Sequence, residues 1–241
     1  MATSTRRALG GWFLLSGGFS MLQAGSYTVQ PVRIELSARQ FRTTVQTRNL
    51  GNEPTTVQAH VVAWKAEGVE EVLSDSDDIL LNPPIFTLAP GQVQSMRLGL
   101  RRLPSDAAEV TYRLILEEVP PPMPPGFMGV QPVLKISIPI FFKPKLPAAQ
   151  LTWKVRRSAN RDLSLSVENQ GNAHVQIKQL SITAPGRPEP DFVTNTLTYV
   201  LRTGRKEWTI RDAQLTGSGR LVVQVRTDIG DLREVVVPDI P

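Results

Sequence analysis

The chain has 241 residues, of which 41% are hydrophobic and 20% charged, so it is too apolar for a disordered protein and long enough for one or two domains. Its net charge of +5 is scattered along the chain and only 6% of the residues are aromatic, which argues against a nucleic-acid-binding protein. It contains no cysteine, which excludes disulfides, thiolate metal sites and cysteine nucleophiles.

The first residues have the order that is typical of a secretory signal peptide. Two arginines, Arg6 and Arg7, precede the short apolar stretch 8–15, and the small residues Ala24, Gly25 and Ser26 end the segment. The apolar stretch is too short and too rich in glycine to serve as a membrane anchor. We therefore expect residues 1–26 to be a cleaved signal peptide and the mature protein to be exported.

From Tyr27 onward the hydrophobic pattern has a period of two, which predicts β-strands. The segments 43–48, 56–64 and 110–116 are rich in β-branched residues, and turn sequences with Pro, Gly, Asn and Asp separate them. No stretch shows a helical period. The sequence therefore predicts an all-β protein built from sandwiches of two packed sheets.

A break in the strand pattern predicts a domain boundary. Pro144 and Pro147 lie close together between lysines and form a short, stiff connector. The strand pattern restarts at 150–155 and continues almost to the C-terminus. We therefore expect two β-sandwich domains, 27–145 and 146–241.

A proline-rich segment, 119–129, precedes an unusually long predicted strand that runs from Val130 to Phe142. Five of the eleven residues in this segment are prolines, so we expect an extended, polyproline-like loop. In the strand every even-numbered residue is apolar. Pro132 and Pro139 also lie in it, and proline is confined to sheet edges and bulges because it cannot donate a backbone hydrogen bond.

The length and the prolines of this strand suggest that it binds another protein. A long hydrophobic edge strand is an aggregation hazard that soluble proteins normally avoid. Strand addition would use such an edge, since backbone hydrogen bonds would supply affinity and alternate side chains would fill pockets in the partner. Alternation alone is equally typical of a strand that packs one face on the core of its own sandwich, and both interpretations stay open at this point.

The residue types that carry enzyme chemistry are sparse. The two histidines, His60 and His174, belong to no metal-binding or nucleophile-activating spacing, and neither a phosphate-binding glycine loop nor a nucleophile elbow occurs. The acidic turn 74–78 lacks the glycine and the terminal glutamate of a calcium-binding loop. We expect no catalytic residue, no metal, no cofactor and no small-molecule substrate.

A series of short motifs runs from the first strand into the second domain, at residues 29–36, 46–52, 58–64, 82–98, 112–121, 140–144, 206–208 and 227–230. The strongest begins Asn82-Pro83-Pro84. Each motif is weak by itself, but their number and order are specific. Together they resemble the PapD-like periplasmic chaperones of the chaperone–usher pathway over nearly the whole mature chain.

This resemblance implies a fold and a function. The implied fold is two immunoglobulin-like domains at an angle, with a cleft between them. The implied function is that of a periplasmic chaperone, which lends its long strand to a pilus subunit that lacks its own final strand and delivers the subunit to an outer-membrane usher. An exposed edge also needs protection in the free protein, and a self-capping dimer would supply it.

The resemblance also implies site residues. The family holds the C-terminal carboxylate of the subunit in the cleft with an arginine and a lysine, a charge-assisted contact. Arg33 matches the arginine, but the expected lysine position holds Pro139. The second cation is therefore open among three residues, Lys135, Lys143 and Arg97. The expected subunit-binding residues of the long strand are Val130, Pro132, Leu134, Ile136 and Ile138.

The departure at Pro139, the proline-rich loop and the absence of cysteine are most similar to the archaic branch of the family, which assembles pili of the spore-coat-protein-U type. Two other functions remain as alternatives. One is a structural or adhesive immunoglobulin-like module on the cell surface or in a fibre. The other is a periplasmic protein that binds a small ligand, although the sequence shows no converging polar site for one.

Overall fold

The computed structural model describes residues 27–123, 126, 128–157, 162–184, 186–211 and 220–238. Within these residues every regular element is a β-strand, so the all-β prediction is confirmed. No helix that could span a membrane is found in this described part. The predicted signal peptide, 1–26, lies outside the described residues.

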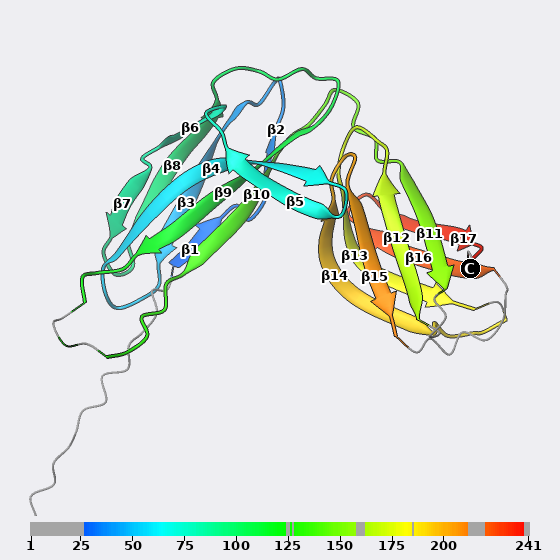
Figure 1. Cartoon of the computed structure of the whole chain (residues 1–241). Coiled ribbons are helices and arrows are strands. Elements are labelled where there is room, and N and C mark those ends of the chain that lie inside the picture. Colours follow the sequence, from blue (N-terminus) through cyan, green and yellow to red (C-terminus); the bar gives the residue numbers. More distant parts are fainter. Residues whose placement is uncertain are drawn as a thin grey trace, which may run out of the picture.

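The N-terminal domain is a sandwich of two sheets (Figure 1). One sheet has the strand order β1-β3-β8-β6, and the other has the order β2-β10-β9-β4-β5, with β7 paired to β4. The strands of this domain are β1 Tyr27–Gln30, β2 Ile34–Leu36, β3 Arg42–Asn49, β4 Thr55–Glu67, β5 Glu70–Asp75, β6 Ile79–Asn82, β7 Ile85–Leu88, β8 Val93–Leu100, β9 Val110–Val119 and β10 Lys135–Phe142.

The C-terminal domain is a second, smaller sandwich (Figure 1). Its sheets have the orders β11-β12-β15 and β14-β13-β16-β17. Its strands are β11 Leu151–Arg157, β12 Leu163–Asn169, β13 Val175–Thr183, β14 Phe192–Val200, β15 Arg205–Ile210, β16 Leu221–Thr227 and β17 Asp231–Val236. The boundary predicted at 145/146 lies in the connector between β10 and β11.

Each sandwich has its own core, and the period of two in the sequence explains how it forms. In β8, for example, Met96 and Leu98 point inward and are buried, whereas Ser95 and Arg97 alternate with them and are exposed or nearly so. Burial of each such apolar side chain contributes about 1.5–3 kcal/mol. The two cores are separate clusters, one on either side of the connector.

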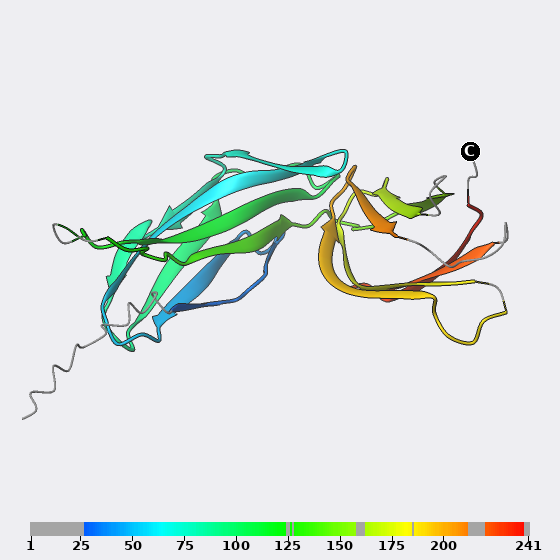
Figure 2. The ribbon, with the colours of Figure 1, turned by 60° about the horizontal axis from the view of Figure 1, so that its bottom comes forward.

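The two domains are joined end to end (Figure 2), and a third, small cluster lies where they meet. Trp64 and Phe141 come from the N-terminal domain, and Leu201 comes from the C-terminal domain together with the partly buried Tyr199. The centroid of the Tyr199 ring lies 5.6 Å from that of the Trp64 ring and 5.3 Å from that of the Phe141 ring. We call this region the joint.

Backbone contacts close the joint on two sides. On one side, the β4–β5 turn meets the β14–β15 turn, where the Arg205 N–H donates to the Gly68 carbonyl at 2.8 Å. A Cβ on Gly204 would come within 2.8 Å of the Ala66 Cβ, so this approach requires a glycine. On the other side, the Glu109 N–H donates to the Asn172 carbonyl at 2.8 Å.

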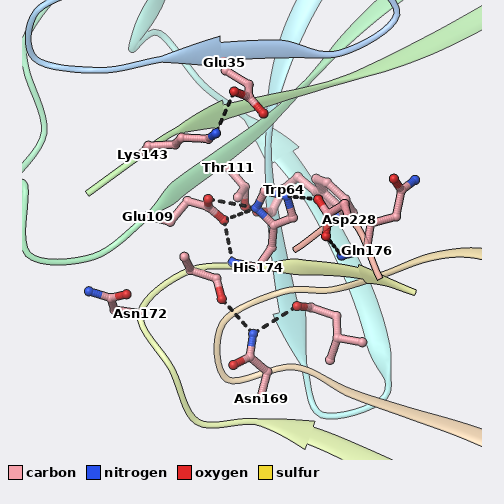
Figure 3. Close-up of polar contacts among 12 residues, drawn as sticks. Glu35, Trp64, Glu109, Thr111, Lys143, Asn169, Asn172, His174, Gln176 and Asp228 are labelled. Carbon is pink, nitrogen blue, oxygen red and sulfur yellow. Dashed lines mark hydrogen bonds and ion pairs between the residues drawn. The ribbon is translucent and has the colours of Figure 1, made fainter. Parts of the chain in front are cut away.

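The turn that presents His174 to the joint is held by a buried asparagine. The Asn169 side chain donates to the carbonyls of Ala173, at 2.8 Å, and Val200, at 3.1 Å (Figure 3). Asn172 in the same turn donates to the Leu146 carbonyl of the connector at 3.0 Å. The turn therefore ties the connector to the second domain and fixes where His174 lies.

Candidate functional site

One edge of β10 is open over part of its length. β10 pairs with β9 from Lys135 to Phe142, but on its other side the parallel strand β2 covers only Ile140 to Phe142. Among the described residues no strand pairs with the outer edge of Lys135 to Pro139. The sequence prediction of an edge strand therefore has a defined place in the structure, the part of β10 before Ile140.

The strand is shorter than the sequence predicted, because β10 begins at Lys135 and not at Val130. Pro132 has no backbone N–H to donate to a ladder. The Leu134 N–H is taken by a side chain, the Glu118 carboxylate at 3.2 Å, although the Leu134 carbonyl still accepts from the Glu118 N–H at 3.0 Å. Residues 130–134 thus continue the line of β10 without forming a regular strand.

The five residues expected to bind a subunit differ in burial. Val130 is 85% exposed and Pro132 is exposed, whereas Leu134 and Ile136 are half-buried against the core of the N-terminal domain. Ile138 is only 2% exposed and belongs to that core. Both interpretations of the alternating pattern therefore apply, each to a different part of the row.

Arg33 lies at the joint, just before β2, and its guanidinium has several partners. Nη1 donates to the Asp228 carboxylate at 2.8 Å and Nη2 donates to His174 Nε2 at 3.0 Å. Nε lies 3.1 Å from Glu35 Oε1. The guanidinium carbon also lies 5.1 Å from the centroid of the Phe141 ring, in the range of a cation–π contact.

The His174 ring connects Arg33 to a buried carboxylate of the N-terminal domain. Its Nδ1 lies 2.8 Å from both oxygens of Glu109, and the His174 backbone N–H donates to Glu109 at 3.0 Å (Figure 3). A guanidinium only donates, so Nε2 accepts from Arg33 and the proton on Nδ1 donates to Glu109. The ring also stacks on Phe141, with centroids 3.6 Å apart.

The Glu109–His174 contact should stabilise the joint strongly. Replacing Glu109 by alanine leaves two buried donors of His174 without an acceptor, and we expect it to lower the free energy of unfolding by about 2–4 kcal/mol. Urea unfolding followed by tryptophan fluorescence measures this, since Trp64 lies in the joint. The exposed Glu67→Ala variant is the control, with an expected change within about 0.5 kcal/mol. Equal effects of the two variants would contradict the assigned contact.

Asp228 gives the joint a pH dependence. Burial alone would raise the pKa of Asp228, but the Gln176 N–H and the Arg33 guanidinium outweigh it and hold that pKa below 3.8. A carboxyl group with a lowered folded pKa stabilises the fold above its unfolded pKa, and this stabilisation disappears as the pH falls through the folded value. We expect the Tm of the native chain to fall more steeply between pH 5 and pH 3 than the Tm of Asp228→Asn. Parallel curves would contradict this role.

Arg113 is a second cation at the joint, and the sequence did not single it out. In the β9–β10 register it lies directly opposite Pro139, the position where the family resemblance expects a lysine. Its guanidinium carbon lies 3.7 Å from the centroid of the Trp64 ring, and its Nη2 lies 3.5 Å from Glu71 Oε2. Glu71 is shared with Lys206 of the C-terminal domain, at 2.7 Å.

The two arginines differ in how well their charge is compensated. Burial lowers the pKa of Arg113, and Glu71 and Tyr199 do not fully offset this. Burial acts in the same direction on Arg33, but the hydrogen bond and charge of Asp228 outweigh it, so the pKa of Arg33 is raised. Both arginines lie over the same aromatic cluster: the Arg33 guanidinium carbon is 6.0 Å from the centroid of Tyr199, that of Arg113 is 3.7 Å from the centroid of Trp64, and these two rings are 5.6 Å apart.

The three cations left open by the sequence have different surroundings. Lys143 bonds Glu35 at 2.6 Å (Figure 3). Glu35 also contacts Arg33, so Lys143 lies near Arg33. Lys135 pairs with Glu117 at the start of β10, and Arg97 lies on the outer face of the other sheet. Lys143 is the one of these three that the structure brings to Arg33.

Arg33 meets the odd-numbered row of β10, and not the even-numbered row that contains the expected subunit-binding residues. Phe141, the residue beneath its guanidinium, belongs to the odd row, as does Pro139. The even row faces the interior of the sandwich. Among the described residues no group of three or more His, Asp or Glu side chains is arranged to hold a metal ion.

Solved structures show where this fold occurs. A complex of the chaperone CsuC with the tip subunit CsuE, from archaic Csu pili of Acinetobacter baumannii, matches with a TM-score of 0.64 and 20% identity over 89% of this chain and 99% of that one. The SafB chaperone of Salmonella enterica, solved with the SafA pilin, matches with a TM-score of 0.58 and 21% identity over 88% and 97%. The E. coli chaperone DraB matches with a TM-score of 0.56 and 16% identity over 91% and 98%. These likenesses confirm the predicted two-domain fold.

Family membership rests on the sequence of the N-terminal domain. No curated protein matches the chain significantly. Residues 26–147, half of the chain, match the family model described as the pili and flagellar-assembly chaperone, PapD N-terminal domain. The resemblance seen in the sequence is thereby confirmed, and the chain belongs to the PapD-like family of pilus-assembly chaperones.

Proposed function

We propose that the protein is a periplasmic chaperone that adds the open edge of β10 to a pilus subunit lacking its final strand, and that it delivers the subunit to an outer-membrane usher. One observation carries this proposal. β2 covers only Ile140 to Phe142, so within the described part of the chain the backbone groups of Lys135 to Pro139 that face away from β9 have no strand partner.

The side chains along this edge fit strand addition. Each new backbone hydrogen bond would contribute about 0.5–1.5 kcal/mol. Leu134 and Ile136 are half-buried, so each still has apolar surface to offer, and Val130 and Pro132 extend that surface beyond the regular strand. Ile138 is already covered by its own domain. Its contribution would be to support the strand, and the main contacts with a subunit would come from the residues before it.

Arg113 completes the proposed carboxylate anchor. Arg33 and Arg113 lie over adjacent rings of the joint, Tyr199 and Trp64, and Arg113 occupies the rung of Pro139, where the family lysine is missing. A guanidinium presents paired N–H groups that match a carboxylate. We therefore propose Arg33 and Arg113 as the two cations of the anchor. Lys143, which bonds Glu35, supports the Arg33 side.

The relatives support the choice of partner and compartment. CsuC was solved with a tip subunit and SafB with a pilin, so both of those chaperones bind pilus subunits. A further match, SfaE, is described as a periplasmic chaperone, which agrees with the signal peptide predicted at residues 1–26. The archaic branch, the usher and a self-capping dimer remain predictions of the sequence.

Co-expression with a pilus subunit tests the proposal. The subunit should accumulate only when the chaperone is present, and the two should purify from the periplasm as a one-to-one complex. A surface or fibre module predicts the opposite pattern, in which the protein is cut by protease added to whole cells and the subunit is equally stable without it. That second pattern would exclude the chaperone function.

A further inference from the structure

The guanidinium of Arg33 already holds a carboxylate of its own chain. Asp228, from the turn between β16 and β17, accepts from Nη1 at 2.8 Å, and its side chain is only 12% exposed. Arg33 and Asp228 are 195 residues apart in sequence and belong to different domains. This ion pair therefore links the two domains across the joint. It also occupies the arginine that is proposed to anchor the subunit carboxylate.

Both edges of this guanidinium that could hold a second carboxylate include a nitrogen that already has a partner. A bidentate contact with a carboxylate needs parallel N–H groups on two nitrogens of the guanidinium, either Nη1 with Nη2 or Nη2 with Nε. Nη1 donates to Asp228 and Nη2 donates to His174. Nε is buried and faces Glu35 without a hydrogen-bond geometry. An incoming carboxylate that takes two parallel N–H groups of Arg33 therefore meets at least one of these partners, and at the Nη1–Nη2 edge it approaches the Asp228 carboxylate.

The charges around the two arginines indicate where an incoming carboxylate binds first. Arg33 and Lys143 pair with the carboxylates of Glu35 and Asp228, and Glu109 lies on the far side of the His174 ring, so a further carboxylate there would add to the negative charge.

Arg113 and Lys206 share the single carboxylate Glu71, so the Arg113 side retains positive charge. A subunit carboxylate should therefore meet Arg113 first.

Asp228 can release Arg33 and keep its place in the second domain. Its Oδ1 accepts from the Gln176 N–H at 2.8 Å, and its backbone N–H donates to the Gln176 carbonyl at 3.0 Å. Thr227 beside it closes the same turn through the Gly230 carbonyl. Loss of the Arg33 contact therefore leaves the turn intact and removes one of several contacts between the domains.

We propose that Asp228 is an internal competitor for Arg33, and that a subunit carboxylate bound at Arg113 reaches Arg33 by displacing Asp228, which loosens the joint. This rests on the proposed chaperone function and specifies one step of it. Subunit capture and the angle between the domains are then coupled, because both depend on the same guanidinium.

Peptide binding tests the competition. The probe is a synthetic peptide with the C-terminal strand of the co-expressed subunit, made with either a free carboxylate or a C-terminal amide, and calorimetry measures the Kd. Asp228→Asn, which keeps an acceptor for Gln176, should bind the carboxylate form about tenfold more tightly than the native chain, with no change for the amide form. The gain should vanish in the double variant with Arg33→Ala. The exposed Asp231→Asn, three residues further on, should change neither Kd.

The outcomes separate the two proposals. If the native chain binds neither peptide, the chaperone function itself fails, and the competition with it. If both peptides bind and Asp228→Asn leaves the preference for the free carboxylate unchanged or weaker, the competition alone is wrong.

A second measurement is independent of affinity. The chain has no cysteine, so spin labels at Ser95→Cys and Lys178→Cys, which lie on exposed positions of different domains, are unambiguous. Addition of the carboxylate peptide should broaden or shift the distance distribution of the native chain. Asp228→Asn should show part of that change without peptide. A distribution that stays the same in both cases would overturn the coupling.

Discussion

Replacing Leu134 by glutamate should abolish the capture of a pilus subunit. Leu134 is half-buried against the core and lies beside the open edge of β10, so strand addition would place its remaining surface in an apolar groove of the subunit. An unpaired carboxylate in such a groove costs several kcal/mol. We expect a loss of affinity of more than about 100-fold, because each 1.4 kcal/mol is a factor of ten. Copurification from the periplasm measures it.

The neighbouring Val133→Glu is the matched control. Val133 is 53% exposed and lies on the opposite row, so its glutamate would stay in solvent and the complex should form. Circular dichroism and thermal unfolding of the free variants exclude misfolding as the cause. A Leu134→Glu variant that copurifies as well as Val133→Glu would show that this edge does not bind the subunit.

Replacing Arg113 by alanine should be the second large effect. Truncating one partner of a desolvated charge pair costs about 2–5 kcal/mol, so we expect subunit affinity to fall at least about 30-fold. Arg113→Lys keeps the charge but loses the paired N–H groups, and an intermediate loss is expected. The loss should be absent for a subunit whose C-terminal carboxylate has been converted to an amide.

Arg42 provides the control for Arg113. It also lies over an aromatic ring, that of Phe41 at 4.7 Å, but on β3 of the other sheet. Arg42→Ala therefore removes a similar cation–π contact without touching the joint, and subunit affinity should not change. If Arg113→Ala and Arg42→Ala have the same small effect, Arg113 is not part of the anchor.

The repetitive part of the fold could be predicted from the sequence. Alternation places Leu114 and Leu116 of β9 inward, and both are fully buried. Alternation alone could not predict which of the even-numbered residues from Val130 to Ile138 stay accessible to a partner. Ile138 is covered because β2 and the opposite sheet close over that end of the strand, and this closure depends on contacts between segments roughly 100 residues apart.

The proposed site could be predicted only where one segment determines it. The strand context singled out Arg33 as the expected anchor, which stays a prediction, but its contacts with Asp228, His174 and Glu109 involve distant parts of the chain that only the folded joint brings together. Arg113 escaped prediction for a related reason, since its place opposite Pro139 follows from the pairing register of β9 and β10. Knowing that register, a cation on the neighbouring rung would have been the natural replacement for the missing lysine.

The aromatic cluster at the joint has a consequence for how the molecule unfolds. Trp64 and Phe141 are fully buried, yet part of what covers them, Leu201 and Tyr199, belongs to the other domain. Either domain by itself would expose to water an apolar patch that the other domain covers in the whole chain. Calorimetry should therefore show one cooperative transition for the whole chain, and the excised N-terminal domain should be less stable and more prone to aggregate than its own core alone would imply.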